Sequence, residues 1–305
     1  EQVIPTNGSE QAIRLLGDVY LDESTVCVCP SPTFPVYTTA FEHSGTRTAL
    51  VPLTKASGAD CDALLRTALA EVDEATGQEG QTRYVDGEGV VVCLSTINNP
   101  TGGAVAKDAF MRLLKGLPSR ALLVVDEAYF EFGREQGLDL NGLELLQRYC
   151  TCPWICLRTF AKAYSFAGAR IGYAIFSTPT LASAMFKVKG VFPVNTLAQV
   201  GAVALMKEED YMRACVRRII SERNKMAQEL ESLGCTVLPS YANFLMFSWP
   251  HSGVQEFWEA LRLQGVLVTP MGTIAGVADN AIRMTMCTEE ANAEALRVIR
   301  ELVPR

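Results

Sequence analysis

Two short apolar runs, Val90-Val-Val-Cys-Leu94 and Leu122-Leu-Val-Val125, and the helical pattern between them decide the fold. Both runs are rich in β-branched residues, and three further runs of this kind occupy residues 25–29, 154–157 and 171–176. Strands that alternate with helices predict an α/β fold. Because the runs are apolar throughout, without alternating polar residues, we expect a mostly parallel sheet with helices on both faces.

The last third of the chain follows a different pattern. Apolar residues recur at helical spacing from residue 212 to residue 233, and Gly234 should end this long helix. After it we expect strands at residues 236–238, 243–247, 266–269 and 281–286, a helix at residues 254–263 and a final helix. We therefore predict a large domain of residues 1–208 and a small α+β domain of residues 209–305. Residues 75–89, rich in Gly, Glu and Gln, should form an exposed excursion.

The composition limits what the protein can bind. Its 305 residues carry a formal net charge of -7, whereas binding to nucleic acid requires clustered Lys and Arg. We therefore expect a small-molecule partner and no nucleic acid. No apolar stretch approaches the roughly 20 residues of a membrane helix, so we expect a soluble protein without membrane contact. The two histidines, His43 and His251, leave little from which to build a Ser-His-Asp hydrolase.

The ten cysteines lack the spacing of a disulfide framework and fall mainly within apolar runs. We expect free, buried thiols and a reducing, cytoplasmic location. The group Cys150, Cys152 and Cys156 suggests zinc, but no second cysteine pair or histidine pair accompanies it. We therefore expect no metal.

One lysine and one arginine follow the run at residues 154–157, in the segment Leu157-Arg-Thr-Phe-Ala-Lys162-Ala-Tyr-Ser-Phe-Ala-Gly-Ala-Arg170-Ile-Gly-Tyr173. This segment is either a surface turn with two solvated cations or the site of a Schiff-base lysine. In the second case, neighbours and desolvation would lower the pKa of Lys162 from about 10.4 and make its amine nucleophilic. Thr159 and Arg170 would then donate hydrogen bonds to a phosphate.

Polar side chains also follow other strands. Asp126, in Val124-Val-Asp-Glu-Ala-Tyr129, is either a helix cap or ion-pair partner, or an acid that keeps a pyridinium nitrogen protonated. The run Ile97-Asn-Asn-Pro-Thr-Gly-Gly103 predicts a turn in which Asn99 is placed to donate its amide to a ring hydroxyl oxygen. Near the start, Thr6-Asn-Gly-Ser-Glu-Gln-Ala12 leads into an amphipathic helix. Ser9 should cap this helix, whose first N–H groups are also available to a phosphate.

Together and in this order, these segments resemble the fold type I, class I/II aminotransferases, and among them most of all the histidinol-phosphate aminotransferases. The resemblance runs from the first residues to the last helix. The Lys162 and Arg170 segment, Asn99-Pro-Thr-Gly102 and Asp126-x-x-Tyr129 are specific as a set. The resemblance implies a large domain that binds pyridoxal 5'-phosphate and a smaller C-terminal domain. It also implies transamination between an amino acid, histidinol-phosphate-like or aromatic, and a 2-oxo acid.

The resemblance gives each matching residue a role. Lys162 would hold the cofactor as an imine and move the substrate proton, Asp126 would pair with the pyridine nitrogen, and Tyr129 would complete the catalytic set. Asn99 and Tyr129 would hydrogen-bond the ring oxygen, and Phe34 would stack on the ring. The phosphate would be held by Gly8, Ser9, Glu10, Thr159 and Arg170. Arg283 would grip the substrate carboxylate beside Asn99, although its residue type and place alone suggest an exposed charge on an edge strand.

The sequence also departs from the family pattern. Ala161 stands where the family usually has serine, Cys287 replaces a customary glycine, and Thr269 replaces the arginine that commonly holds a distal substrate phosphate. The family has an N-terminal arm, and this sequence begins after it. Two alternatives follow: a decarboxylase of phosphorylated amino acids that uses the same lysine and aspartate, and an inactive interaction protein on this scaffold. The family further implies a homodimer, because its active sites are completed across a two-fold interface.

Overall fold

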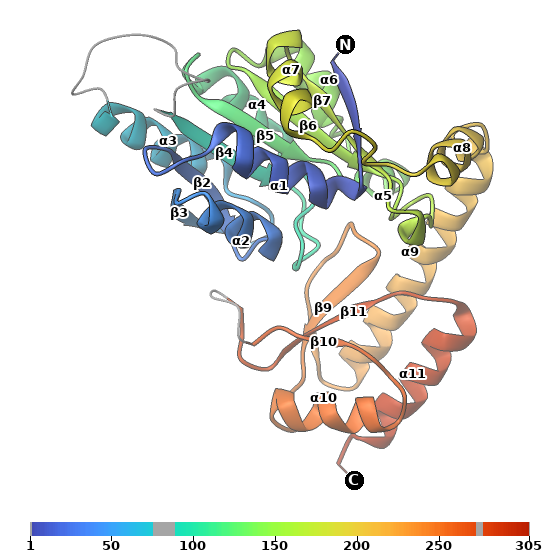
Figure 1. The fold of residues 1–305 in the computed structure, drawn as a ribbon. Helices are drawn as coiled ribbons and strands as arrows, with labels where there is room; N and C mark the ends of the chain where they lie inside the picture. Colours follow the sequence, from blue (N-terminus) through green and yellow to red (C-terminus); the bar gives the residue numbers. More distant parts are fainter. Residues whose placement is uncertain (1, 76–88, 273–276, 305) are drawn as a thin grey trace.

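The computed structural model describes residues 2–75, 89–272 and 277–304. Within these residues, the larger sheet has seven strands in the order β1-β7-β6-β5-β4-β2-β3 (Figure 1). All of them run in one direction except β7, which is antiparallel to both of its neighbours. The strands are β1 (Val3–Thr6), β2 (Val26–Ser31), β3 (Arg47–Pro52), β4 (Val90–Ser95), β5 (Leu122–Asp126), β6 (Trp154–Thr159) and β7 (Gly172–Phe176). Residues 76–88, most of the predicted excursion, lie outside the described residues.

Helices cover both faces of this sheet. One face carries α1 (Gly8–Tyr20), α2 (Pro35–His43) and α7 (Pro179–Val188), and the other carries α3 (Cys61–Ala75), α4 (Lys107–Gly116) and α6 (Gly142–Tyr149). Within β4, Val92 and Leu94 pack on the second group of helices, whereas Val91 and Cys93 pack on the first. Because both sides of the strand are buried, its residues from Val90 to Leu94 are all apolar, as predicted, and only the last residue, Ser95, is polar.

The sequence did not predict β1 and β3, which lie at the two edges of the sheet. The side chains of β1 alternate between exposed and buried, and β3 begins and ends with exposed residues, Arg47 and Pro52. An edge strand has one open side and tolerates charges and proline. Neither strand therefore forms the continuous apolar run by which the central strands were found.

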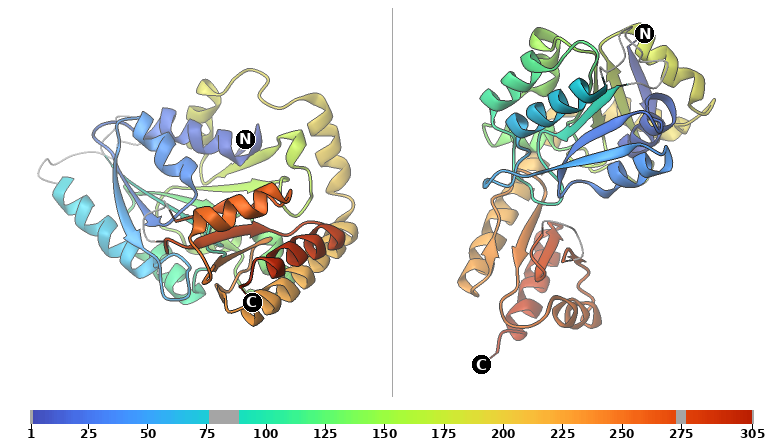
Figure 2. Two further views of the ribbon diagram at one scale, coloured as in Figure 1. Left: turned by 90° about the horizontal axis from the view of Figure 1, so that it is seen from below. Right: turned by 90° about the vertical axis from the view of Figure 1, so that its left-hand side faces the viewer.

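In the described part of the chain, a second sheet contains four antiparallel strands in the order β10-β11-β9-β8. The strands are β8 (Thr236–Val237), β9 (Phe244–Ser248), β10 (Thr269–Pro270) and β11 (Ala281–Thr285). Helices α10 (Val254–Leu263) and α11 (Glu289–Glu301) pack on it, together with the C-terminal half of α9 (Glu209–Ser232). In the right-hand view of Figure 2, this sheet and its helices lie below the larger sheet, and α9 joins the two parts. The predicted division at residue 208 falls one residue before α9 begins.

Gly234 ends α9 where the sequence predicted it. Its φ of 85° places it in the left-handed region, and the N–H of Cys235 donates to the carbonyl of Leu230 at 3.1 Å. The predicted strand at residues 266–269 is wrong for its first three residues. The indole N–H of Trp258 donates to the carbonyl of Val268 at 3.1 Å, so this segment is held by α10 instead of by a neighbouring strand.

Candidate active site

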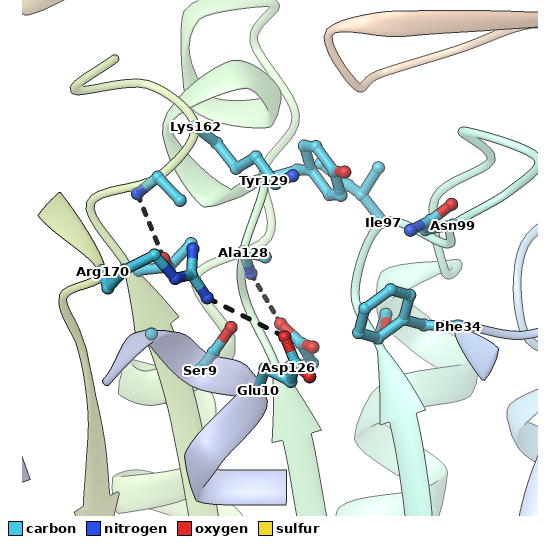
Figure 3. Close-up of a pocket in the computed structure, with 14 residues that line it drawn as sticks. Ser9, Glu10, Phe34, Ile97, Asn99, Asp126, Ala128, Tyr129, Lys162 and Arg170 are labelled. Carbon is cyan, nitrogen blue, oxygen red and sulfur yellow. Dashed lines mark hydrogen bonds and ion pairs between the residues drawn. The ribbon is translucent and has the colours of Figure 1, made fainter. Parts of the chain in front are cut away.

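The carboxyl ends of β4, β5 and β6 and the start of α1 enclose a cavity of about 160 Å³. In Figure 3, Lys162 lies above Asp126, with Ser9 and Arg170 on one side and Phe34 and Asn99 on the other. All the residues that the sequence assigned to the cofactor line this cavity. They are Gly8, Ser9, Glu10, Phe34, Asn99, Asp126, Tyr129, Thr159, Lys162 and Arg170. Ligands of open α/β sheets commonly bind at this edge.

Asp126, the last residue of β5, is 6% exposed, and both of its carboxylate oxygens accept hydrogen bonds. Oδ1 accepts from the N–H of Ala128 at 2.8 Å, and Oδ2 accepts from the hydroxyl of Tyr37 at 3.0 Å. Burial raises the pKa of the Asp126 carboxyl, while these two donors and the Lys162 ammonium oppose the rise. The two hydrogen bonds and the nearby ammonium therefore offset part of the effect of burial on the carboxylate.

Lys162 lies in the loop after β6 and is half-buried, so it is not a solvated surface cation. Its Nζ lies 5.6 Å from the centroid of the Tyr129 ring. Burial lowers the pKa of Lys162, and the Arg283 and Arg170 cations lower it further, while Asp126 opposes them. A lysine in such surroundings is a nucleophile at a lower pH than an exposed lysine.

The start of α1 reaches the cavity because two glycines allow close approach. Gly8 has a φ of 69°, and a Cβ there would lie 2.8 Å from Nη2 of Arg170. A Cβ on Gly172 would lie 2.6 Å from the backbone nitrogen of Ser9. The predicted cap at Ser9 is wrong, because Asn7 precedes the helix and its N–H donates to Oε1 of Gln11 at 2.7 Å.

Hydrogen-bond donors gather at this end of the cavity. The hydroxyl of Thr159 accepts from the N–H of Ala161 at 3.1 Å, which fixes its position. Arg170 has a left-handed backbone with a φ of 59°, and its Nη2 lies 3.8 Å from Oε2 of Glu10. Together with the first N–H groups of α1, these side chains form a typical anion-binding arrangement.

Arg283 approaches the cavity from the second sheet. Its Nη1 donates to Oδ1 of Asn99 at 2.6 Å, and its buried Nε has no hydrogen-bond partner among the described residues. β11 lies between β10 and β9, so Arg283 is not on an edge strand, contrary to the interpretation from its residue type alone. The predicted turn around Asn99 is confirmed by the bond from the N–H of Gly102 to the carbonyl of Asn98 at 2.8 Å.

A buried ion pair connects the ends of β5 and β6 next to the site. Nη2 of Arg158 lies 2.8 Å from Oε2 of Glu127, whose side chain is fully buried. Arg158 also lies over the ring of Phe130, at the start of α5 (Phe130–Glu135), 4.1 Å from its centroid. Because Glu127 follows Asp126 and Arg158 precedes Thr159, the pair ties together the ends of the two strands that present them. We did not identify this pair from the sequence.

The sequence also raised the questions of disulfides, a metal site and a membrane helix. All ten cysteines are free thiols within the described part of the chain, and most are buried, as predicted. Among the described residues, no group of three or more His, Cys, Asp or Glu is arranged to hold a metal ion. No described helix is both long and apolar enough to cross a membrane.

Residues 1–299 match the protein family described as aminotransferase class I and II. The chain belongs to this family. A histidinol-phosphate aminotransferase of Carboxydothermus hydrogenoformans is 33% identical over 302 residues, which cover 99% of this chain and 76% of the relative. An aromatic amino acid aminotransferase of Cutibacterium acnes is 31% identical over 302 residues, covering 99% of this chain and 78% of the relative.

A solved structure has the same fold as this aminotransferase. Histidinol-phosphate aminotransferase from Sinorhizobium meliloti, crystallised with pyridoxal 5'-phosphate, has a TM-score of 0.79 and 24% identity. The likeness covers 99% of this chain and 77% of that protein. The protein is thus an enzyme that catalyses transamination with pyridoxal 5'-phosphate, and these findings give no support to the decarboxylase or inactive alternatives.

The residues of the cavity fit this cofactor chemically. The end near α1 offers N–H and hydroxyl donors suited to a phosphate, and a side chain on Gly8 would fill part of it. The end of β5 offers the Asp126 carboxylate, an acceptor suited to a protonated ring nitrogen. The aromatic ring of Phe34 and the amine of Lys162 line the same cavity.

Proposed function

We propose that this aminotransferase binds its cofactor between Lys162 and Asp126 and transfers the amino group of an aromatic amino acid to a 2-oxo acid. The observation that carries the proposal is one cavity lined by a half-buried amine, a buried carboxylate and an anion-binding helix start. When bound, pyridoxal phosphate supplies an aldehyde that accepts the amino group and a ring that withdraws electrons from the substrate α-carbon.

Each residue has a distinct task in the proposed mechanism. Lys162 would hold the cofactor at its aldehyde. Once the substrate amine has displaced the lysine, its free amine would act as the base that removes the substrate α-proton and as the acid that returns it. Asp126 keeps the ring nitrogen protonated. Asn99, oriented by its bond to Arg283, and Tyr129 donate to the ring oxygen, and Phe34 orients the ring by stacking. Gly8, Ser9, Glu10, Thr159 and Arg170 hold the phosphate, the first three through the start of α1.

Arg283 and the residue paired with it on β10, Thr269, favour an aromatic substrate. Arg283 offers N–H donors, including Nε, to the substrate carboxylate in the bidentate manner of a guanidinium. Thr269 is paired with Arg283 in the register of β10 and β11, at the position where the resembled enzymes commonly have a phosphate-binding arginine. Without that charge, an apolar ring is a better side chain than a phosphate. The aromatic amino acid aminotransferase of Cutibacterium acnes is a relative with such a substrate.

We further propose that the enzyme is a cytoplasmic homodimer. Exposed apolar side chains begin in the last turn of α7 and continue along α8 (Thr196–Leu205), a pattern that marks interaction surfaces. They are Phe186, Val188, Val191, Phe192, Leu197, Val200, Val203 and Met206, which we call the α8 surface. The ten free thiols support a reducing compartment. We propose the domain division at residue 208 because each sheet has its own hydrophobic core.

Cofactor binding at Lys162 can be tested with the purified protein. Added pyridoxal phosphate should give a visible absorbance band, and reduction with borohydride should leave the cofactor on the peptide that contains Lys162. Lys162→Ala should lose both signals, whereas Lys115→Ala, which changes an exposed lysine on α4, should keep them. A parent protein that stays colourless, or that is labelled at another lysine, would overturn the proposal.

The substrate class can be tested in single-turnover half-reactions. Phenylalanine and tyrosine should convert the bound cofactor to its amino form faster than histidinol phosphate does. Faster conversion by histidinol phosphate would reverse the proposed preference, and release of carbon dioxide would contradict transamination.

A further inference from the structure

Tyr37 makes a polar contact with the site from outside the cavity. Its ring is 1% exposed, and its hydroxyl donates to Oδ2 of Asp126 at 3.0 Å. Its ring packs against Phe41 on the face of the sheet that also carries the Cys27 and Cys93 thiols. A hydroxyl in such apolar surroundings is costly to bury unless it is hydrogen-bonded. Asp126 is therefore the partner that accounts for a tyrosine at this position.

The residue that precedes α2, Phe34, lines the cavity. Phe34 immediately precedes α2, and Tyr37 follows three residues later, a spacing that places both rings on one side of a helix. The two rings meet edge to face, with centroids 6.5 Å apart and planes at 83°. One short segment thus carries both the Phe34 ring, which lines the cavity, and the Tyr37 hydroxyl, which donates to the Asp126 carboxylate.

The bond has a direction that matters for the chemistry. Burial and the nearby Asp126 charge raise the pKa of the Tyr37 hydroxyl, so Tyr37 stays a proton donor at neutral pH. A donor to a buried carboxylate stabilises the ionised form and fixes the plane of the group. With Oδ1 bonded to the N–H of Ala128 and Oδ2 to Tyr37, Asp126 is held in one rotamer.

We propose that Tyr37 is a positioning residue that holds Asp126 as an oriented carboxylate, ready to accept a hydrogen bond from the ring nitrogen of the cofactor. This inference rests on the proposed function of the cavity. It predicts that the effect of the Tyr37 hydroxyl depends on the ring nitrogen.

The test compares two cofactors in three proteins. The cofactors are pyridoxal phosphate and its 1-deaza analogue, in which a C–H group replaces the ring nitrogen. The proteins are the parent, Tyr37→Phe and the matched control Tyr20→Phe, which removes another buried hydroxyl, bonded to the carbonyl of Leu181 at 2.7 Å. Affinity is measured by absorbance titration of the cofactor-free proteins, and circular dichroism checks that each is folded.

Tyr37→Phe should bind pyridoxal phosphate roughly tenfold more weakly than the parent, because a hydrogen bond to a charged group is lost. Its affinity for the deaza analogue should change less than about twofold, since that ring has no N–H for Asp126 to accept. Tyr20→Phe should match the parent with both cofactors. In an Asp126→Asn background, the Tyr37→Phe change should have little further effect.

The outcomes separate this inference from the function on which it rests. Equal weakening with both cofactors, or an undiminished effect in Asp126→Asn, would mean that Tyr37 only supports the fold. Unchanged binding of pyridoxal phosphate would remove its role altogether. A parent that does not bind pyridoxal phosphate would overturn the proposed function itself, and this inference with it.

Discussion

Burial is the largest influence on the pKa values of both Lys162 and Asp126, and their neighbours add to it for the lysine and oppose it for the carboxyl. Burial lowers the pKa of the lysine and raises that of the carboxyl, so both groups shift towards their neutral forms. For Lys162 the two nearby arginines add to the shift, which favours the neutral amine that a nucleophile needs. For Asp126 the donors from Ala128 and Tyr37 oppose the shift, which favours the charged form that a ring nitrogen needs.

The pKa of Lys162 yields a prediction about pH. In the cofactor-free protein, acetylation of Lys162 should have its midpoint below 10.5, the ordinary value for lysine, because burial and Arg283 disfavour the ammonium form. Arg283→Leu should raise this midpoint, whereas Arg283→Lys, which keeps the positive charge, should leave it close to that of the parent. Mass spectrometry of the Lys162 peptide at a series of pH values measures the midpoint. Identical midpoints in all three proteins would contradict the prediction.

The same shift affects stability with a definite sign. The folded-state pKa of Lys162 is lower than the unfolded-state pKa, so between the two values the unfolded chain binds more protons. This lysine therefore destabilises the fold below its folded-state pKa. The destabilisation diminishes as the pH rises towards 10.5.

Thr269 yields a prediction about substrate choice. Thr269→Arg places a guanidinium across the strand pair from Arg283, where it can meet a phosphate on the substrate side chain. We expect kcat/KM for histidinol phosphate to rise about tenfold relative to phenylalanine, since a charge-assisted pair is gained. Thr269→Gln has a similar reach without the charge and should leave the ratio unchanged. An equal gain in both variants would show that charge at this position does not set the preference.

At the scale of single elements, the end of the cavity beside α1, which we propose holds the phosphate and call the phosphate end, depends on how closely α1 approaches β7 and the Arg170 loop. Gly8 and Gly172 permit that approach, the first with its left-handed backbone and the second by lacking a side chain next to Ser9. Ser9 does not cap the helix, so the backbone rather than a cap shapes this end of the cavity. A helix start arranged in this way presents its first N–H groups to an anion.

Gly8→Ala should therefore weaken cofactor binding selectively. An L-residue in the left-handed region costs about 1–2 kcal/mol, and the new Cβ would displace the Arg170 guanidinium, 2.8 Å away. We expect about tenfold weaker binding of pyridoxal phosphate and a smaller loss for pyridoxal, which has no phosphate to hold. Gly168→Ala is the control, because a Cβ there meets nothing within 4 Å. Equal losses for both ligands would place the defect outside the phosphate end.

The elements that could be predicted from the sequence are those whose residue types follow directly from their burial. Both faces of β4 and β5 are buried, so an unbroken apolar run identified them, and α9 was found from its periodicity and its terminal glycine. The edge strands β1 and β3 have no such pattern, and β10 is short because α10 binds the segment before it. The direction of β7 and the position of Tyr37 beside Asp126 depend on tertiary packing, which single segments do not reveal.

At the scale of the whole molecule, the C-terminal part of the chain contacts the loop that carries Asn99, one of the residues lining the cavity. Arg283 of β11 bonds to Asn99 beyond β4, and the N–H of Tyr241 donates to the carbonyl of Gly102 at 2.8 Å. Helix α9 spans both parts: Met212 and Val216 pack beside Tyr129 and Phe132, and its C-terminal half belongs to the core of the second sheet. A substrate held between Arg283 and Lys162 would therefore contact both parts of the molecule at once.

The α8 surface yields the prediction for the assembly. Leu197, on α8, is 84% exposed, and Leu267, beside the second sheet, is 80% exposed. Because the two leucines are about equally exposed, Leu267 is a matched control outside the α8 surface. If the α8 surface joins two copies of the chain, Leu197→Glu puts a charge into a desolvated contact, and the dimer should dissociate at least tenfold more readily. Leu267→Glu should leave the association unchanged. Sedimentation velocity over a hundredfold range of protein concentration measures both. A monomeric parent, or equal effects of the two substitutions, would exclude the α8 surface as the dimer interface.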